Sequence, residues 1–330
     1  MKHIQRFLVA LLLLLSVLTA TPAQASIKTK EDGVLNIGVF QFVAHPALDD
    51  MAEGIEEVMS EYAEKQGLDL EIDFQNGQGD MGLVSSIAKE MVNKDPDILF
   101  AIATPPVQAL QQETDEIPII MAGVTDPVRN ELIDDEEKPG ANVTGALEET
   151  PPENQIHLIQ KVLPEAKTIG MIYSSSEVNA KPQVERARAE AEKQGFKVIE
   201  ETISSTVDMQ LVAQEVSDKV DAIYLPTDNI IASSLDTLLD ATDKKKIPVF
   251  PTAETMVEQG GLAADALSQY EIGVLAAEMA IDVLEGADPA TYPARGTDDT
   301  KLVYNSETME YLGIELPKDI LEEATDLSKE

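Results

Sequence analysis

The amino-acid sequence predicts an α/β protein in which two doubly wound parallel-sheet lobes enclose a ligand cleft. Two observations lead to this prediction. Short, largely apolar segments alternate with longer segments of helical periodicity, a pattern typical of strands buried on both faces of a parallel sheet. The alternation runs to residue 124 and begins again at residue 168. The 330 residues are also enough for two domains of about 100–200 residues each.

The first unit is expected to contain four strands and two clear helices. The strands are the apolar runs at residues 34–42, 70–75, 98–103 and 117–124. Met51, Ile55 and Tyr62 recur on one face of an expected helix at residues 46–66, and a second helix is expected at about residues 81–92. Strand and helix at this spacing predict a buried parallel sheet.

A junction between the two units is expected at residues 144–154, because Gly145, Pro151 and Pro152 interrupt the periodicity there. The second unit repeats the alternation, with strands expected at residues 168–174, 196–203, 222–227, 247–252 and 261–267. Its helices are expected at residues 181–194, 209–216 and 230–241. A long helix at residues 270–284 follows the last strand.

Composition argues against several classes of partner. The chain has 61 acidic and 24 basic residues and a formal net charge of −37. Nucleic acid and anionic membrane surfaces are therefore not expected as partners, because both need clustered Lys and Arg. A hydrophobic content of 43% is enough to build cores, so the charge is interpreted as a solvated acidic surface on a folded protein.

The N-terminus has the features of a secretory signal peptide at residues 1–25. Lys2 and Arg6 precede an apolar stretch at residues 7–15, and Ala23-Gln24-Ala25 offers small residues two positions apart for cleavage near Ala25. The apolar stretch is shorter than the ~20 residues that a membrane span needs. The chain has no Cys, hence no lipidated cysteine and no disulfide. A periplasmic location without a lipid anchor is therefore expected.

Ligands of open parallel sheets bind beyond the carboxyl ends of the strands, and this rule selects a set of turns. The selected turns are largely polar and lie at residues 41–45, 76–80, 104–105, 125–126, 174–176 and 227–229. Asp126, Ser174, Asp228 and Asn229 could instead serve only as caps of the following helices. If the turns converge on one cleft, a carboxylate and several hydroxyls and helix N-terminal amides would suit a small zwitterion.

One motif resembles a dinucleotide phosphate loop but does not predict a cofactor. Gly77-Gln78-Gly79-Asp80-Met81-Gly82 satisfies G-x-G-x-x-G between a strand and a helix. It follows the second strand of its unit instead of the first, and the Asp80 carboxylate lies where a pyrophosphate would approach. The glycines are expected to let backbone amides face another ligand, and no cofactor is expected.

No catalytic or metal site is predicted. Without Cys there is no thiol nucleophile, and no G-x-S-x-G motif is present. His3 lies in the signal peptide, while His45 and His157 lie in different units without metal-ligand spacing. His45 could line the cleft or cap the helix that follows it.

Several of these turns carry the motifs of a known family. They are HPALD at residues 45–49, FQNGQGDM at 74–81, AIATPPVQAL at 101–110, VTDPV at 124–128, KPGANVTG at 138–145, IYLPTDN at 223–229 and YNSETMEYLGIELP at 304–317. Over residues 34 to 319 the chain resembles the ABC-transporter substrate-binding proteins of the tryptophan/tyrosine type. The resemblance implies a type-I periplasmic-binding-protein fold with several crossovers between its lobes. The N-terminal lobe is expected at residues 34–146 plus about 268–330, and the C-terminal lobe at about 147–267.

The resemblance also implies a site for an amino acid in the cleft. The implied ligand-binding residues are Gln41, His45, Asn76, Asp80, Thr104, Thr125, Asp126, Ser174, Thr227, Asp228 and Asn229. Asp228 is expected to accept the ligand ammonium group, and Thr104 and Thr125 to bind its carboxylate. Relatives often have an acidic residue and two tyrosines where this chain has Ser268-Gln269-Tyr270. A branched or polar amino acid therefore stays possible beside an aromatic one.

The expected function is capture of a small molecule, chiefly an aromatic amino acid, and its delivery to an ABC permease by a monomeric protein. Two alternatives stay open. The protein could report its ligand to a sensory receptor, or it could be a periplasmic enzyme on the same scaffold, which would need a polar pair with perturbed pKa values in the cleft.

Overall fold

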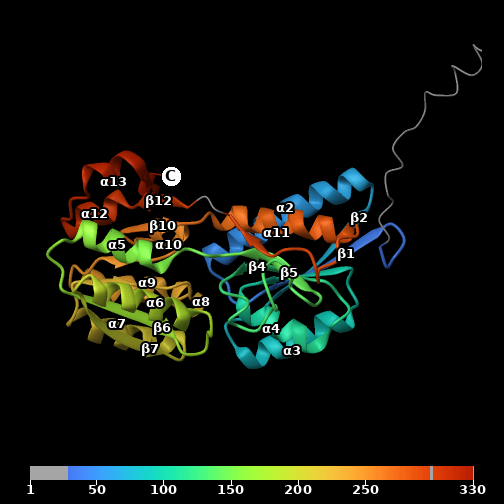
Figure 1. Cartoon of the computed structure of the whole chain (residues 1–330), viewed down its shortest axis with the longest axis horizontal. Coiled ribbons are helices and arrows are strands. Elements are labelled where there is room, and N and C mark those ends of the chain that lie inside the picture. Colours follow the sequence, from blue (N-terminus) through green and yellow to red (C-terminus); the bar gives the residue numbers. More distant parts are fainter. Residues whose placement is uncertain (1–28, 298–299, 330) are drawn as a thin grey trace, which may run out of the picture.

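The structure is a computed structural model that describes residues 29–297 and 300–329. The predicted signal peptide at residues 1–25 lies outside the described residues. Two α/β lobes lie side by side (Figure 1), and each contains a parallel sheet between layers of helices. The predicted fold class is therefore confirmed.

The first lobe is built on a six-stranded, all-parallel sheet in the order β11-β5-β4-β3-β1-β2. The strands are β1 (Val34–Gln41), β2 (Asp69–Asn76), β3 (Ile98–Ile102), β4 (Ile119–Val124), β5 (Val143–Leu147) and β11 (Arg295–Gly296). Every residue of β3, β4 and β5 is buried. This burial explains why the central strands are continuous apolar runs without polar alternation.

Four helices cover the two faces of this sheet. They are α2 (Pro46–Gln66), α3 (Met81–Asn93), α4 (Thr104–Glu113) and α11 (Gln269–Leu284). The helices α2 and α11 pack on one face and α3 and α4 on the other (Figure 1). A Cβ atom at Gly273 would lie 2.1 Å from the carbonyl oxygen of Met51, so the close crossing of α11 over α2 requires glycine at that position.

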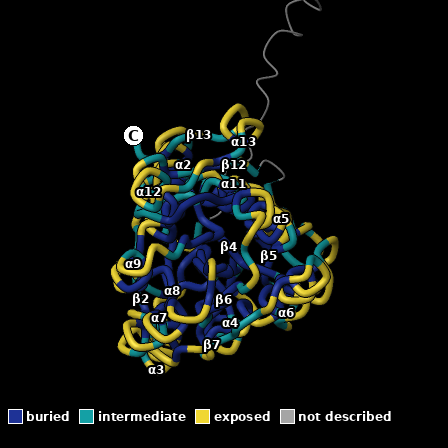
Figure 2. Tube along the Cα trace, turned by 90° about the vertical axis from the view of Figure 1, so that its left-hand side faces the viewer, coloured by how far each residue is buried: buried dark blue, intermediate teal, exposed yellow. Residues whose placement is uncertain are grey.

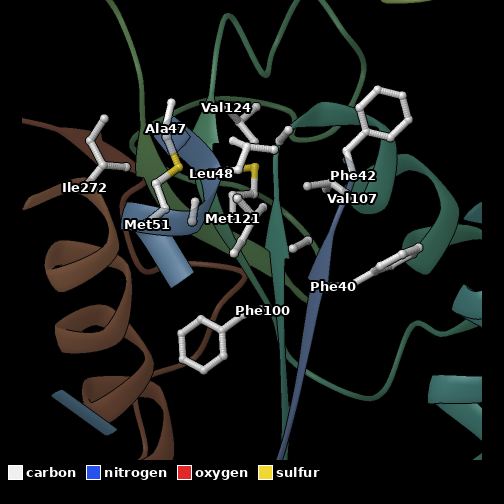
Figure 3. Close-up of a cluster of buried hydrophobic side chains, with 14 of the residues drawn as sticks. Phe40, Phe42, Ala47, Leu48, Met51, Phe100, Val107, Met121, Val124 and Ile272 are labelled. Carbon is white, nitrogen blue, oxygen red and sulfur yellow. The ribbon is translucent and has the colours of Figure 1, made fainter. Parts of the chain in front are cut away.

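The core of the first lobe fills the space between α2, α11 and the sheet. Figure 3 shows Met51 and Leu48 of α2 beside Met121 of β4, with Ile272 of α11 on the other side. All four side chains are at most 2% exposed. This packing fixes the start of α2, and with it the residues that precede the helix, relative to the sheet.

The second lobe contains a four-stranded parallel sheet in the order β7-β6-β8-β9 and a smaller sheet in the order β10-β12-β13. The strands are β6 (Thr168–Ser174), β7 (Lys197–Ile203), β8 (Ala222–Tyr224), β9 (Val249–Phe250), β10 (Ala263–Ala266), β12 (Lys301–Tyr304) and β13 (Thr325–Asp326). The helices are α5 (Pro152–Val162), α6 (Ala180–Lys193), η1 (Thr206–Asp208), α7 (Met209–Ser217), α8 (Asn229–Ala232), α9 (Leu235–Asp243), α10 (Glu254–Glu258), α12 (Ser306–Leu312), α13 (Lys318–Glu323) and η2 (Leu327–Lys329). In Figure 2 the buried strands β4 and β6 lie inside a shell of exposed helices and turns.

The expected extent of the first lobe is wrong at its C-terminal end. The segment expected there was about 268–330. Its first part does return to the first lobe as α11 and β11, but β12 then pairs antiparallel with β10 of the second lobe. Leu316 and Ile320 lie in the second lobe's core together with Ile156 and Tyr224. The chain therefore crosses between the lobes three times, after β5, after β10 and after β11.

Three local expectations also differ from the structure. The helix expected at residues 230–241 is interrupted between α8 and α9, where Ser234 leaves the helical conformation (φ −120°, ψ 19°) and its hydroxyl donates to the Ile230 carbonyl (2.8 Å). The strand expected at residues 261–267 joins the smaller sheet, where its partner β12 is antiparallel. The first residues of the expected junction belong to β5. In this strand Gly145 has φ 143°, and a Cβ there would lie 2.3 Å from the Met121 backbone.

Candidate ligand-binding site

The carboxyl ends of the two parallel sheets face a small space between the lobes. Residues from both lobes and from two of the three crossovers line it, and the polar ones include His45, Glu148, Thr227, Asp228, Asn229 and Gln269. Leu48 and Met256 contribute apolar surface. The space measures about 20 Å³, which is the room that one water molecule needs. An amino acid therefore requires the lobes to separate or the lining side chains to move.

On the first-lobe side, polar side chains at the ends of β1 and β2 bond to one another. The amide nitrogen of Gln41 donates to Asp49 (2.7 Å), and the Gln41 side-chain oxygen accepts from Asn76 (3.3 Å). Gln41 is 1% exposed, so its partners satisfy groups that water does not reach. His45 follows β1 directly and stands at the N-terminal end of α2.

On the second-lobe side, Asp228 is fixed by backbone amides. Its carboxylate accepts hydrogen bonds from the N–H of Ile231 (3.0 Å) at the start of α8 and from the N–H of Ser174 (2.5 Å) at the end of β6. The Asp228 side chain thus links the ends of two elements, and the residue is 3% exposed. Burial raises the pKa of its carboxyl group.

A second buried carboxyl group, Glu177, lies next to Asp228. It accepts from the Ile230 N–H (2.8 Å) and from the Asn229 amide (2.5 Å), and it is 2% exposed. Burial, and then the nearby charge of Asp228, raises the pKa of Glu177 well above its usual range. The proximity of the two carboxyl groups therefore disfavours the state in which both are ionised.

One hydrogen bond between buried side chains joins the two faces of the site. Nε2 of His45, in the first lobe, lies 3.2 Å from Oδ1 of Asn229, in the second. The Asn229 amide nitrogen already donates to Glu177, so Oδ1 is the acceptor and the imidazole Nε2–H is the donor. Burial lowers the pKa of His45 to about 4, which makes the ring neutral at pH 7.

The crossovers place a third carboxyl group at the site. Glu148 follows β5, Gln269 begins α11, and the Gln269 amide nitrogen donates to the Glu148 carboxylate (3.1 Å). Both side chains are buried, with exposures of 5% and 1%. Burial raises the pKa of Glu148 to about 7, opposed only in part by the hydrogen bond from Gln269.

The structure brings together part of the predicted residue set. His45, Thr227, Asp228 and Asn229 line the enclosed space, and Gln41, Asn76 and Ser174 lie at the neighbouring strand ends. Thr125 and Asp126 line a second recess of about 110 Å³ between the lobes, opposite Gln183 and Arg186 of α6.

The other two predicted residues lie outside both spaces. Thr104 begins α4 and is buried, but it lines neither of them. Asp80 is exposed and caps α3 through the N–H groups of Gly82 (2.8 Å) and Leu83 (3.1 Å).

Sequence reasoning missed Glu148, Glu177 and Gln269. Glu177 lies only three residues beyond β6, so a wider window after that strand would have included it. Gln269 stood out as a departure from the family pattern but was not assigned to the site. Glu148 carries no local signal, because it is one of 61 acidic residues and the strand before it was expected as a junction.

Two further kinds of site were sought in the part of the chain that the structure describes. No group of three or more His, Cys, Asp or Glu side chains there is placed to hold a metal ion. Within the same residues, no helix combines the length and the hydrophobicity that crossing a bilayer requires.

Comparison with known proteins identifies the family. The family model for ABC transporter substrate binding proteins matches residues 36–328. A tyrosine-binding protein of Clostridioides difficile (strain R20291) is 37% identical over 288 residues, which cover 87% of this chain and 84% of that protein.

Two solved structures share this architecture at similar identity. An ABC domain from Streptococcus pneumoniae in complex with L-Trp is 40% identical, with a TM-score of 0.85 and coverage of 89% of this chain and 99% of that one. The ligand-free, open structure of a substrate-binding protein from Clostridium difficile is 36% identical, with the same coverage and a TM-score of 0.66. The chain therefore belongs to the ABC transporter substrate-binding proteins, a family of solute-binding proteins.

Proposed function

We propose that this protein binds an aromatic amino acid between its lobes and delivers it to an ABC permease. The observation that carries the proposal is the likeness to two proteins whose ligands are aromatic amino acids, tyrosine in the relative at 37% identity and L-Trp in the structure at 40%. The groups that line the site suit such a ligand once the lobes or the lining side chains have moved, because they include buried carboxylates and amides together with the apolar surface of Leu48 and Met256.

Lobe closure over the ligand is part of the proposal. The chain superposes better on the L-Trp complex than on the open, ligand-free structure, with TM-scores of 0.85 and 0.66 at nearly equal identity. The His45–Asn229 hydrogen bond between the lobes and the small enclosed space support a closed arrangement. The ligand would enter after hinge opening and be retained by contacts made only in the closed state.

The proposed setting is the periplasm, reached with a signal peptide that is cleaved near Ala25. The absence of Cys from the sequence supports a mature protein without an N-terminal lipid anchor. A freely diffusing monomer would carry one ligand at a time to the permease. Deletion of the gene should therefore reduce uptake of the same amino acid that the purified protein binds.

Calorimetric titration and thermal unfolding with a panel of amino acids test the proposed ligand class. L-Tyr, L-Trp and L-Phe should bind, whereas L-Leu, L-Gln and L-Lys should bind far more weakly. At a free concentration of about 100 Kd, the bound ligand should add about 2.7 kcal/mol to the free energy of unfolding. Preference for a branched or polar amino acid would contradict the aromatic assignment, and no stabilisation by any amino acid would contradict the function.

A further inference from the structure

Two ionisable carboxyl groups from different parts of the fold, Glu148 and Asp228, line the enclosed space. If the ligand is an amino acid, as proposed above, one of them is the natural partner of its ammonium group. Of the described residues that line this space, none is Lys or Arg, so the protein supplies no cation there. The hydrogen bonds of the two carboxylates decide between them.

Both carboxylate oxygens of Asp228 already accept a hydrogen bond from the protein. One of its oxygens accepts the Ile231 N–H and the other accepts the Ser174 N–H. Both donors belong to the second lobe, so these bonds do not depend on the position of the first lobe. Asp228 therefore joins the end of β6 to the start of α8.

Glu148 is held differently. Its backbone is fixed on both sides, because its N–H donates to the Val124 carbonyl (2.9 Å) and its carbonyl accepts from the Thr125 hydroxyl (3.1 Å). Its carboxylate has one hydrogen-bond donor among the described residues, the uncharged amide of Gln269. A buried carboxylate with a single neutral donor has room for further, charged donors.

No charge on the facing elements compensates Glu148. The titratable groups that face the same space are His45 at the start of α2 and Asp228 before α8, with Glu177 behind Asp228. His45 is neutral at pH 7, and the other two are acids. Burial of an uncompensated carboxylate is unfavourable, and it raises the pKa of Glu148 to about 7. A bound cation would remove this penalty.

We propose that Glu148 binds the ammonium group of the ligand, with Gln269 orienting its carboxylate, so that the site selects a compound with a primary amine. Glu148 lies on the crossover after β5, where a bound amine would be in reach of both lobes. In this assignment Asp228 preserves the shape of the second-lobe face, and Glu148 supplies the charge that the ligand neutralises.

Calorimetric titration of wild type, Glu148→Gln and the control Glu149→Gln tests the assignment with three probes. The probes are L-tyrosine, tyramine, which lacks the carboxylate, and 3-(4-hydroxyphenyl)propionate, which lacks the amine. Glu148→Gln should lower the affinity for L-tyrosine and tyramine by about 10–100-fold. It should not lower the affinity for 3-(4-hydroxyphenyl)propionate, which has no amine. The Glu149→Gln protein should bind all three probes as wild type does, because Glu149 is adjacent to Glu148 in sequence but exposed.

A pH series on wild type provides a second measurement that does not depend on the variant's folding. Affinity for L-tyrosine should fall by up to tenfold per pH unit below about pH 7, because the ammonium group must then displace a proton from Glu148. The dependence should disappear in Glu148→Gln, which separates Glu148 from Asp228 and Glu177. Wild-type affinity for L-tyrosine in Glu148→Gln would overturn this assignment alone, whereas failure of wild type to bind any amino acid would overturn the proposed function as well.

Discussion

On the second-lobe face of the cleft, Asp228 accepts from two backbone N–H groups, and Glu177 accepts from one backbone N–H and from the Asn229 amide. On the opposite side, Glu148 is a carboxylate of similar burial, and Gln269 is its side chain's one donor among the described residues. In the first arrangement every carboxylate oxygen has a donor, whereas among the described residues the Glu148 carboxylate has one donor for its two oxygens. Burial alone therefore does not separate these carboxyl groups, whereas the number of donors that each one already has does.

The contrast also assigns different tasks to the two sides. The second-lobe network is preorganised, so its shape should survive opening of the lobes. The crossover side contains Glu148, which no Lys or Arg among the described lining residues compensates. It lies where the chain passes between the lobes. Substitutions on the two sides should accordingly separate loss of folding from loss of binding.

The largest effect is expected from Asp228→Ala. The substitution leaves the buried N–H groups of Ser174 and Ile231 without their acceptor, which should lower the free energy of unfolding by about 4 kcal/mol, measured with urea. Asp80→Ala is the matched control, because Asp80 also caps a helix through two N–H groups but is exposed to water, and its loss should be about 1 kcal/mol. Equal losses in the two variants would show that the Asp228 network contributes no more than an ordinary cap.

The second largest effect is a gain of stability in Glu148→Gln without ligand. The folded-state pKa of Glu148 is raised from 4.5 to about 7, so the folded protein binds this proton more tightly than the unfolded chain. The resulting destabilisation is absent below about pH 4.5, grows through pH 7 and then levels off at about 3 kcal/mol. Urea midpoints should therefore favour Glu148→Gln at pH 8 and be equal to wild type at about pH 4. Equal stability at both pH values would mean that Glu148 is compensated by a cation in the unliganded protein.

A smaller effect is expected from the buried His45–Asn229 hydrogen bond that joins the two faces. His45→Ala, Asn229→Ala and the double variant form a cycle whose coupling free energy should be about 1 kcal/mol in favour of the closed state. The sequence has no Cys, so Lys89→Cys and Lys219→Cys, both exposed and in different lobes, allow fluorescence measurement of the interlobe distance. An unchanged closed population in all three variants would show that other contacts hold the lobes together.

Several features were predictable because they depend on local pattern. The apolar runs predicted the central strands, and the rule that ligands bind beyond strand ends led to His45, Thr227, Asp228 and Asn229. Both signals can be detected within about ten residues of sequence.

The features that were not predicted depend on distant parts of the chain. β12 is a four-residue strand whose place is decided by pairing with β10, about forty residues earlier. Glu148 differs from the other acidic residues only through the crossover geometry and the neighbour that α11 provides. No local window contains that information, and the high acidic content conceals it further.

The smallest effect is expected from a second contact across the cleft, the ion pair between Arg129 of the first lobe and Glu185 of α6 (3.0 Å). Like the His45–Asn229 contact it joins the lobes, but its side chains are 53% and 41% exposed, so water and salt screen the interaction. Arg129→Ala should therefore change the closed population and ligand affinity by less than about twofold, with little further change between 0.05 and 0.5 M salt. A loss as large as that from His45→Ala would mean that rim electrostatics, and not the buried contacts, hold the lobes closed.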